Sequence, residues 1–183
     1  TVPLELMNDS AINIEDLVRG RIQTRLGRIT NRHFTVGAGT TEPLGVVTGS
    51  GVGKTGATGQ TLSITYDDLA DLSESVDQAY LNAGNGTFMF HQQMRRVLRK
   101  LKDVSGRPIW TPDYDMGVTD GVGDTLLGFK VKINNHMPVP AANAKSIAFG
   151  DFSKYMIRDA MDIMMLRFTD SVYMRNGQVG FLA

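Results

Sequence analysis

Apolar and charged residues that repeat with the period of an α-helix, starting near residue 14, restrict the fold of this chain more than any other feature. Asn13 and Asp16 resemble an N-terminal capping box, with Asp in the position usually held by Glu, and they predict a helix that starts at Ile14. An apolar stripe follows at helical spacing: Val18, Ile22, Leu26 and Ile29. A helix of about 20 residues would be about 30 Å long.

A row of arginines lies beside this apolar stripe on the same predicted helix. The row consists of Arg21, Arg25, Arg28 and Arg32, which fall within about 60° of one another at about 100° per residue. Gly20 and Gly27 share a further face, where each costs about 1 kcal/mol of helix stability relative to alanine. These features favour a rod that lies across a surface over a member of a packed bundle.

Two further helices are predicted, and their charged faces have opposite sign. Thr65 caps the first, whose expected buried face is Leu69, Leu72, Val76 and Tyr80. Its acidic residues are Asp67, Asp68, Asp71, Glu74 and Asp77. The second covers residues 92–102 and carries Arg95, Arg96, Arg99, Lys100 and Lys102. The basic face either meets an acidic partner, in the same chain or in a neighbour, or both faces are simply solvated.

Strands are interspersed with these helices without regular alternation, which indicates an α+β fold. The short strands are expected over residues 87–90, 129–133 and 146–149. Residues 155–168 are interpreted as two strands joined near 158–162. Residues 172–182 are interpreted as a strand pair, or a strand and a turn, around Asn176-Gly177.

Composition narrows the possible functions. The 183 residues contain 19 basic and 19 acidic side chains, a balance that argues against a dedicated nucleic-acid binder. There is no cysteine, which excludes thiolate catalysis and zinc–thiolate sites, and the three histidines lie far apart. No apolar run approaches the roughly 18 residues needed to span a bilayer. We therefore predict no catalytic residue, cofactor, metal site or membrane contact.

Residues 48–55, Thr-Gly-Ser-Gly-Val-Gly-Lys-Thr, are one residue short of the phosphate-binding loop of nucleotide hydrolases. In such a loop Lys54 would neutralise phosphate charge and Thr55 would bind magnesium. The motif also needs a helix that begins at the lysine, and the glycines and threonines that follow are poor helix formers. A glycine-rich surface loop is the simpler interpretation.

A second loop, over residues 112–124, is acidic. It contains Asp113, Asp115, Asp120 and Asp124. The spacing fails the pattern of a calcium loop, which needs Gly at the sixth position and Glu at the twelfth, so a solvated acidic loop is favoured.

The order of several short motifs resembles that of tailed-phage major capsid proteins of the HK ninety-seven type. These motifs are Asn31-Arg32-His33-Phe34-Thr35-Val36-Gly37-Ala38-Gly39-Thr40, Pro43-Leu44-Gly45-Val46, Leu127-Gly128-Phe129-Lys130-Val131, Ala148-Phe149-Gly150-Asp151-Phe152 and Asn176-Gly177-Gln178-Val179-Gly180-Phe181. The resemblance implies an α+β capsid fold with a long spine helix. It also implies a peripheral domain over 1–48 and 150–183, and an axial domain over 49–149.

The same resemblance implies a function and partners. The chain would be a phage or prophage head protein that forms hexamers and pentamers of itself and an icosahedral shell around double-stranded DNA, without sequence-specific binding. Scaffold, maturation protease and portal are further expected partners, and assembly is expected in the bacterial host cytoplasm. Arg21, Arg25, Arg28 and Arg32 would belong to a subunit interface, with Asp113 and Asp115 near the symmetry axes.

Relative to the family pattern, the N-terminal arm and extended loop are missing, and the last strand after Phe181 is short. We therefore expect a fragment that does not form shells by itself. Two other functions stay open at this point: a nucleotide hydrolase using Lys54 and Thr55, and a small non-catalytic binding module.

Overall fold

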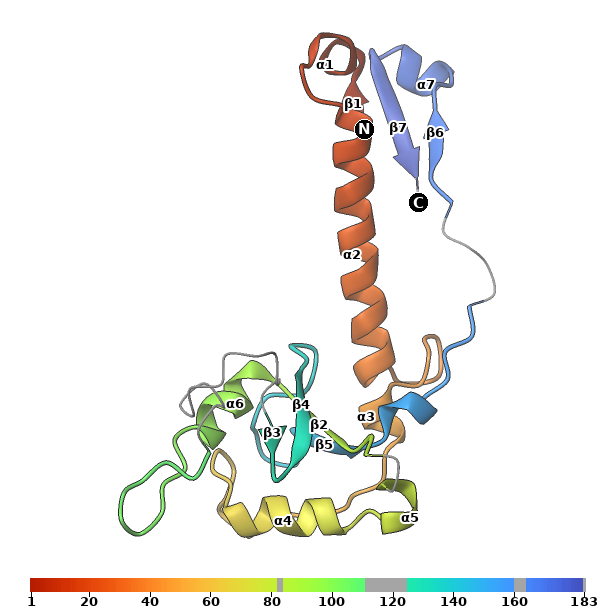
Figure 1. Ribbon diagram of the computed structural model, residues 1–183. Helices are drawn as coiled ribbons and strands as arrows, with labels where there is room; N and C mark the ends of the chain where they lie inside the picture. The colour runs from red at the N-terminus through yellow and green to blue at the C-terminus, as the bar shows by residue number, and fades with distance from the viewer. Residues whose placement is uncertain (82–83, 111–124, 160–163, 183) are drawn as a thin grey trace. The chain divides into compact units, whose positions relative to one another are not determined.

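The computed structural model describes residues 1–81, 84–110, 125–159 and 164–182, and the chain divides into two compact units. The first unit combines Thr1–Asn31 with Ile157–Ala183, and the second is Arg32–Met156. The boundary between them falls inside one continuous helix, α2 (Figure 1).

Helix α2, Ile14–Val36, begins at the predicted residue and runs for 23 residues, a little longer than expected. The Asn13 side-chain oxygen accepts hydrogen bonds from the backbone N–H groups of Glu15 (3.1 Å) and Asp16 (3.3 Å). The Asn13 amide donates in turn to the Asp16 carboxylate at 2.7 Å. The predicted capping pair is therefore present, and it places two carboxylates where the helix dipole favours them.

The first unit contains a three-stranded antiparallel sheet with the order β1–β7–β6. Its strands are β1 (Val2–Pro3), β6 (Leu166–Phe168) and β7 (Gln178–Leu182), and its short helices are α1 (Leu4–Asp9) and α7 (Ser171–Met174). The last strand and the turn before it are confirmed, with Gly177 at φ 59°. Of the two alternatives for this segment, the strand and turn is therefore confirmed and the strand pair is wrong, because Asp170 accepts from the Tyr173 N–H (3.3 Å) and caps α7 before the turn.

Of the two strands expected over residues 155–168, only β6 is found in the described residues. Residues 155–159 have no regular secondary structure and pair with no strand among the described residues, and the limit between the two units falls within them, after Met156. The first of the two expected strands is therefore wrong at residues 155–159, and 160–163 lie outside the described residues.

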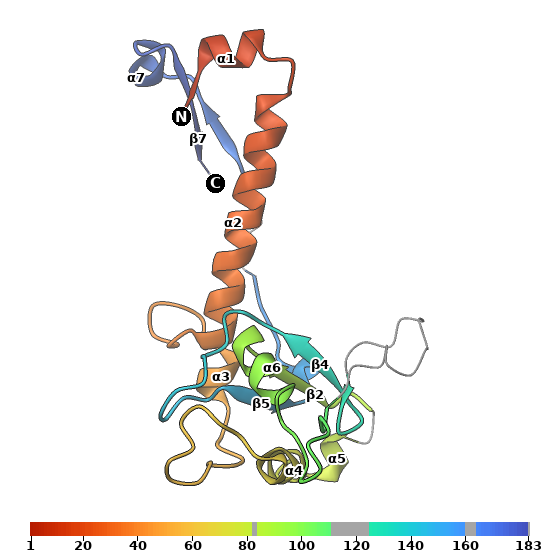
Figure 2. The same cartoon turned by 90° about the vertical axis from the view of Figure 1, so that its left-hand side faces the viewer.

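The second unit is built on a mixed four-stranded sheet with the order β3–β4–β2–β5. The strands are β2 (Thr87–Phe90), β3 (Thr125–Leu126), β4 (Phe129–Ile133) and β5 (Ile147–Gly150). Strand β2 runs parallel to β4 and antiparallel to β5, and the three strands predicted in this region are confirmed. The helices are α3 (Val46–Gly49), α4 (Tyr66–Glu74), α5 (Gln78–Leu81), α6 (Gln92–Leu98) and the 3-10 helix η2 (Phe152–Lys154). Figures 1 and 2 show α4 running below the sheet and α6 beside it.

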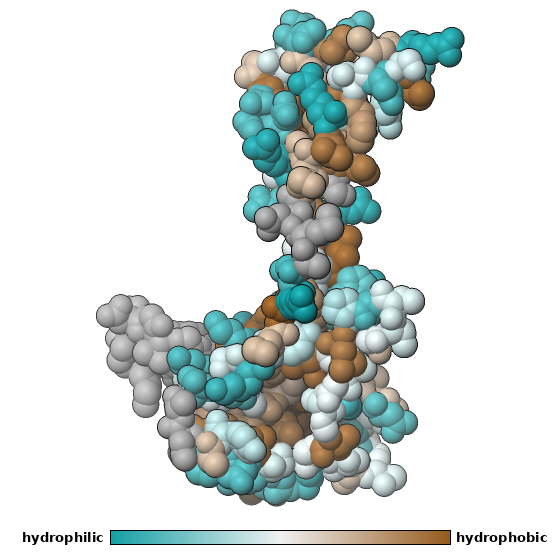
Figure 3. Space-filling view, turned by 90° about the vertical axis from the view of Figure 1, so that its right-hand side faces the viewer, coloured by the Kyte–Doolittle hydropathy of each residue, from teal (hydrophilic) through white to brown (hydrophobic). Residues whose placement is uncertain are grey.

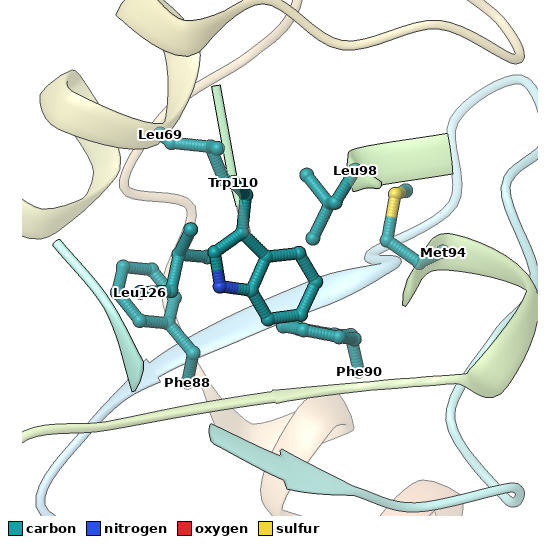
Figure 4. Packing of buried hydrophobic residues seen from close by; sticks show 7 residues of the cluster. All are labelled: Leu69, Phe88, Phe90, Met94, Leu98, Trp110 and Leu126. Atoms are coloured by element: carbon teal, nitrogen blue, oxygen red, sulfur yellow. The ribbon is translucent and has the colours of Figure 1, made fainter. Parts of the chain in front are cut away.

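Seven buried side chains form the core of the second unit (Figure 4): Leu69, Phe88, Phe90, Met94, Leu98, Trp110 and Leu126. The rings of Phe90 and Trp110 meet edge to face, with centroids 6.5 Å apart. The Trp110 indole N–H donates to the Thr125 carbonyl at 2.7 Å, so its polar end is satisfied. Helices α4 and α6 each contribute one apolar face to this core, which leaves their charged faces outside.

The helix capped by Thr65 is shorter than predicted. It ends at Glu74, where the Ser75 hydroxyl donates to the Leu72 carbonyl (2.7 Å), a local bond of the kind that competes with helix continuation. Asp77 then accepts from the Ala79 N–H (2.8 Å) at the start of α5. The expected burial of Tyr80 is wrong, since this side chain is 71% exposed.

Candidate functional site

The arginine row of α2 is exposed along its whole length. Arg21, Arg25, Arg28 and Arg32 lie beside the stripe of Val18, Ile22 and Leu26, which is half-buried. No carboxylate forms a salt bridge with the row in the part of the chain that the structure describes. Four neighbouring cations of this kind form a surface that can receive an acidic partner.

Asp113 and Asp115, the other predicted interface residues, lie outside the described residues, as does the whole acidic loop. Their role near a symmetry axis stays a prediction. Among the described residues, no group of three or more His, Cys, Asp and Glu is placed to hold a metal ion. None of the helices in those residues is long and apolar enough to cross a membrane.

The loop that follows α2 is folded back tightly on the end of this helix. Glu42 contacts the His33 imidazole and accepts from the Ala38 N–H (2.9 Å), and this backbone bond is the main reason that the pKa of Glu42 lies below its ordinary value. The Gly45 N–H donates to the Gly37 carbonyl (3.0 Å). A Cβ on Gly37 would lie 2.1 Å from the Pro43 carbonyl oxygen, so the close approach requires glycine.

The glycine-rich stretch 48–55 does not form a phosphate cradle. No helix begins at Lys54, whose ammonium group contacts the Asp71 carboxylate, and this hydrogen bond is the main cause that raises the pKa of Lys54. The Lys145 ammonium donates to the carbonyls of Val47 (3.1 Å) and Ser50 (2.6 Å). The charge of Lys54 is thus neutralised within the chain, and carbonyl oxygens of the stretch face a cation, whereas phosphate binding would need N–H groups.

A hollow of about 1080 Å³ lies between this loop and the segment over residues 140–152. Its apolar wall includes Leu72, Val76, Met94, Ile147 and Phe149. Figure 3 shows it as a brown recess in the second unit. Lys54, Asp68, Lys145 and Asp151 also line the hollow, but Lys54 and Lys145 are engaged as above, and Asp151 accepts from the Ser153 N–H at 3.0 Å. Three of the four charged side chains that line the hollow are thus engaged in bonds within the chain.

The first unit leaves much of its apolar surface uncovered. In its described part, Val179 is the single large apolar side chain that is buried. The exposed ones are Leu4, Leu6, Ile12, Leu17, Ile29, Ile157, Met164, Leu166, Val172, Met174 and Leu182. Exposed apolar side chains in this number make the first unit a candidate surface for contact with another molecule.

The described residues therefore offer two surfaces suited to contact with another molecule: the arginine row of α2 and the exposed apolar side chains of the first unit. Residues 1–183 all match the model of the phage capsid family, so the chain belongs to this family. The resemblance seen in the sequence motifs is thereby confirmed.

Two solved structures are similar to the chain. A chain from the capsid of an empty gene transfer agent (GTA) particle, computed with C5 symmetry, has a TM-score of 0.76 and 28% identity over 98% of this chain and 63% of that chain. A chain from the capsid of a native GTA particle, also computed with C5 symmetry, has a TM-score of 0.68 and 30% identity over 82% of this chain and 53% of that chain. This chain therefore spans less than two thirds of either capsid chain, and no curated protein matches it. The predicted α+β fold of the HK ninety-seven type is confirmed.

The sequence predicted the arginine row but not the uncovered apolar face of the first unit. The signal was present in the density of Met, Ile and Leu between residues 156 and 166. Residue type alone does not separate apolar side chains that pack inside the unit from apolar side chains that stay exposed on its surface.

Proposed function

We propose that this chain is a major capsid protein subunit, a phage or prophage head protein that assembles with copies of itself into an icosahedral shell around double-stranded DNA. The observation that carries the proposal is the likeness to a capsid chain over 98% of this chain, at a TM-score of 0.76. The family match over residues 1–183 supports it independently. The role is structural, and no residue is assigned a catalytic step.

The organisation implied by the family belongs to the same proposal. The first unit would serve as the peripheral domain and the second as the axial domain of hexamers and pentamers. The expected domain limits at 48/49 and 149/150 remain a prediction, as do contacts with scaffold, maturation protease and portal. The enclosed DNA would be held without sequence-specific contacts, in shells assembled in the bacterial host cytoplasm.

The subunit interface is proposed to include the arginine row of α2 and the acidic residues Asp113 and Asp115. Support for the row comes from its exposure and from the missing partner charge among the described residues. An exposed cationic row beside an apolar stripe combines the two kinds of surface that protein interfaces use.

Electron microscopy of the complete gene product tests the proposal, and shells, or rings of hexamers and pentamers, are the expected result. Arg25→Glu in the row should reduce the number of shells. Arg19→Glu is the matched control, because Arg19 is exposed on the opposite side of the same helix, about 120° or more from every member of the row. A gene product that stays monomeric at every concentration would contradict the capsid function, whereas equal shell yields from both variants would contradict only the role of the row.

The two alternatives are separated by simple measurements. In calorimetry with ATP and magnesium, we expect no nucleotide binding that depends on Lys54, because Lys54 already contacts Asp71 and no helix begins at this residue. ATP binding by the wild type that is lost in Lys54→Ala would favour the nucleotide hydrolase. A small binding module would give neither rings nor shells in the microscope.

A further inference from the structure

Helices α4 and α6 present faces of opposite charge on the outside of the second unit. On α4, Asp67, Asp71 and Glu74 recur at i, i+4 and i+7 and are exposed, while Leu69 and Ser73 on the other side are buried. On α6 and the turn after it, Arg96, Lys100 and Lys102 are exposed, while Met94 and Leu98 are buried.

The chain does not neutralise these two faces against each other. Asp71 contacts Lys54, and the Arg99 guanidinium lies 5.8 Å from the centroid of the Trp110 ring, so both have partners. Among the described residues, no salt bridge joins α4 to α6, and none involves Glu74, Arg96, Lys100 or Lys102.

The position of Glu74 is unfavourable for the helix that carries it. Glu74 is the last residue of α4, and no basic residue occurs in the last turn. A carboxylate there meets the negative end of the helix dipole and the unsatisfied carbonyl groups, where a lysine or arginine would be favourable. A cation from outside the helix would remove this penalty.

We propose that the acidic face of α4 in one copy, centred on Glu74, docks against the basic face of α6 in a neighbouring copy, formed by Arg96, Lys100 and Lys102. The inference rests on the proposed self-assembly. Both halves of the contact are present on every copy and on different elements of the same unit, so the contact can repeat from copy to copy around a ring. Charge complementarity of this kind fixes the register of neighbours and makes assembly sensitive to salt.

The test is charge reversal in the complete gene product, with assembly followed by sedimentation velocity at low and high salt. Glu74→Lys alone and Arg96→Glu alone should each raise the protein concentration needed for half-assembly by about tenfold. The double variant, Glu74→Lys with Arg96→Glu, restores opposite charges across the contact and should recover assembly. The melting temperature of the Glu74→Lys variant should not fall below that of the wild type, because a lysine is favourable in the last turn of α4. If Glu74 instead stabilised its own subunit, the variant would melt at a lower temperature than the wild type.

Lys132→Glu is the matched control, since Lys132 is exposed on β4 and lies on neither face. The inference is overturned if the wild type assembles and both single variants assemble equally well at low salt. It is also overturned if the double variant stays as defective as the single ones, or if Arg96→Glu lowers only the DNA content of complete shells. A wild type that does not assemble at all would overturn the proposed function itself, and the inference with it.

Discussion

Thr65 and Asp68 bond to each other in both directions at the start of α4. The Thr65 hydroxyl donates to the Asp68 carboxylate (2.6 Å) and accepts from the Asp68 backbone N–H (3.2 Å), and the carboxylate accepts from the Thr65 N–H (3.0 Å). We expect Thr65→Ala to lower the free energy of unfolding by about 1 kcal/mol at neutral pH. Urea denaturation followed by the fluorescence of Trp110, the single tryptophan, measures the loss, with Thr61→Ala in the preceding loop as the control.

The same pair of residues makes this contribution sensitive to acid. The hydrogen bond from the Thr65 hydroxyl holds the pKa of Asp68 below its ordinary value. Because the pKa is lower in the folded than in the unfolded state, the stabilisation is complete above the unfolded pKa of about 3.9 and is lost as the pH falls through the folded pKa. The difference between wild type and Thr65→Ala should therefore be constant from about pH 5 to 7 and shrink below about pH 4. If wild type and Thr65→Ala differed in free energy of unfolding by the same amount at about pH 3 and at about pH 6, the charge of Asp68 would contribute nothing to stability.

Lys145 has a comparable role at the end of α3. Its ammonium group donates to carbonyl oxygens of Val47 (3.1 Å) and Ser50 (2.6 Å), so it fixes the start of the glycine-rich loop. Lys145→Met keeps most of the side-chain volume but removes the donors, and we expect it to cost about 1–2 kcal/mol. Limited proteolysis should then cut within residues 51–63 faster than in the wild type, whereas Lys132→Met on β4 should leave the rate unchanged. Equal cleavage of both variants would show that Lys145 does not hold the loop.

At the scale of elements, the glycines near α2 differ in what a side chain would meet. A Cβ at Gly27 meets nothing within 4 Å, whereas a Cβ at Gly45 would lie 2.5 Å from the Gly37 nitrogen. Gly27→Ala should therefore raise the free energy of unfolding of the dissociated subunit by about 1 kcal/mol, because alanine is the better helix former. Gly45→Ala should destabilise it, because backbone must move. Thermal denaturation compares the two, and a loss of stability in Gly27→Ala would contradict the open space around that residue.

Helix starts and half-buried strands could be predicted from the sequence because their causes are local. Asn13 and Thr65 sit next to the helices that they cap, and Phe129 to Ile133 alternate apolar and polar along one strand. The end of α4 was not predictable from periodicity, since it depends on competing bonds of Ser75 and Asp77. Helix α7 was missed because its four residues are too few to show a stripe, although Asp170 gave a capping signal.

At the scale of the whole molecule, the pairing of strands could not be predicted from local sequence patterns. Val2 of β1 pairs with Val179 of β7, and β2 runs parallel to β4 across an intervening stretch that includes α6. Nor could the sequence indicate which apolar residues stay uncovered, since an apolar stripe identifies a face to be buried but not the molecule that buries it. The arginine row was predictable because exposure of charged side chains is the ordinary outcome.

Few apolar side chains are buried in the first unit, and this predicts that its hydrogen exchange differs between dissociated and assembled subunits. With Val179 as the single large apolar residue buried in its described part, the sheet β1–β7–β6 has little to oppose local opening. In dissociated subunits we expect backbone amides of β6 and β7 to exchange with solvent hydrogen about tenfold faster or more than those of β2 and β4, which lie against the core. Assembly should cover the exposed residues and slow exchange in β6 and β7, while β2 and β4 stay unchanged.

Hydrogen exchange with mass spectrometry, on the complete gene product before and after assembly, measures this directly. Peptides from β2 and β4 provide the internal control, because their protection arises within the second unit. If β6 and β7 were as protected in dissociated subunits as β2 and β4, the first unit would be stable without neighbours. Its exposed apolar face would then need an explanation other than contact between copies, since a unit that is already stable gains no protection from being covered.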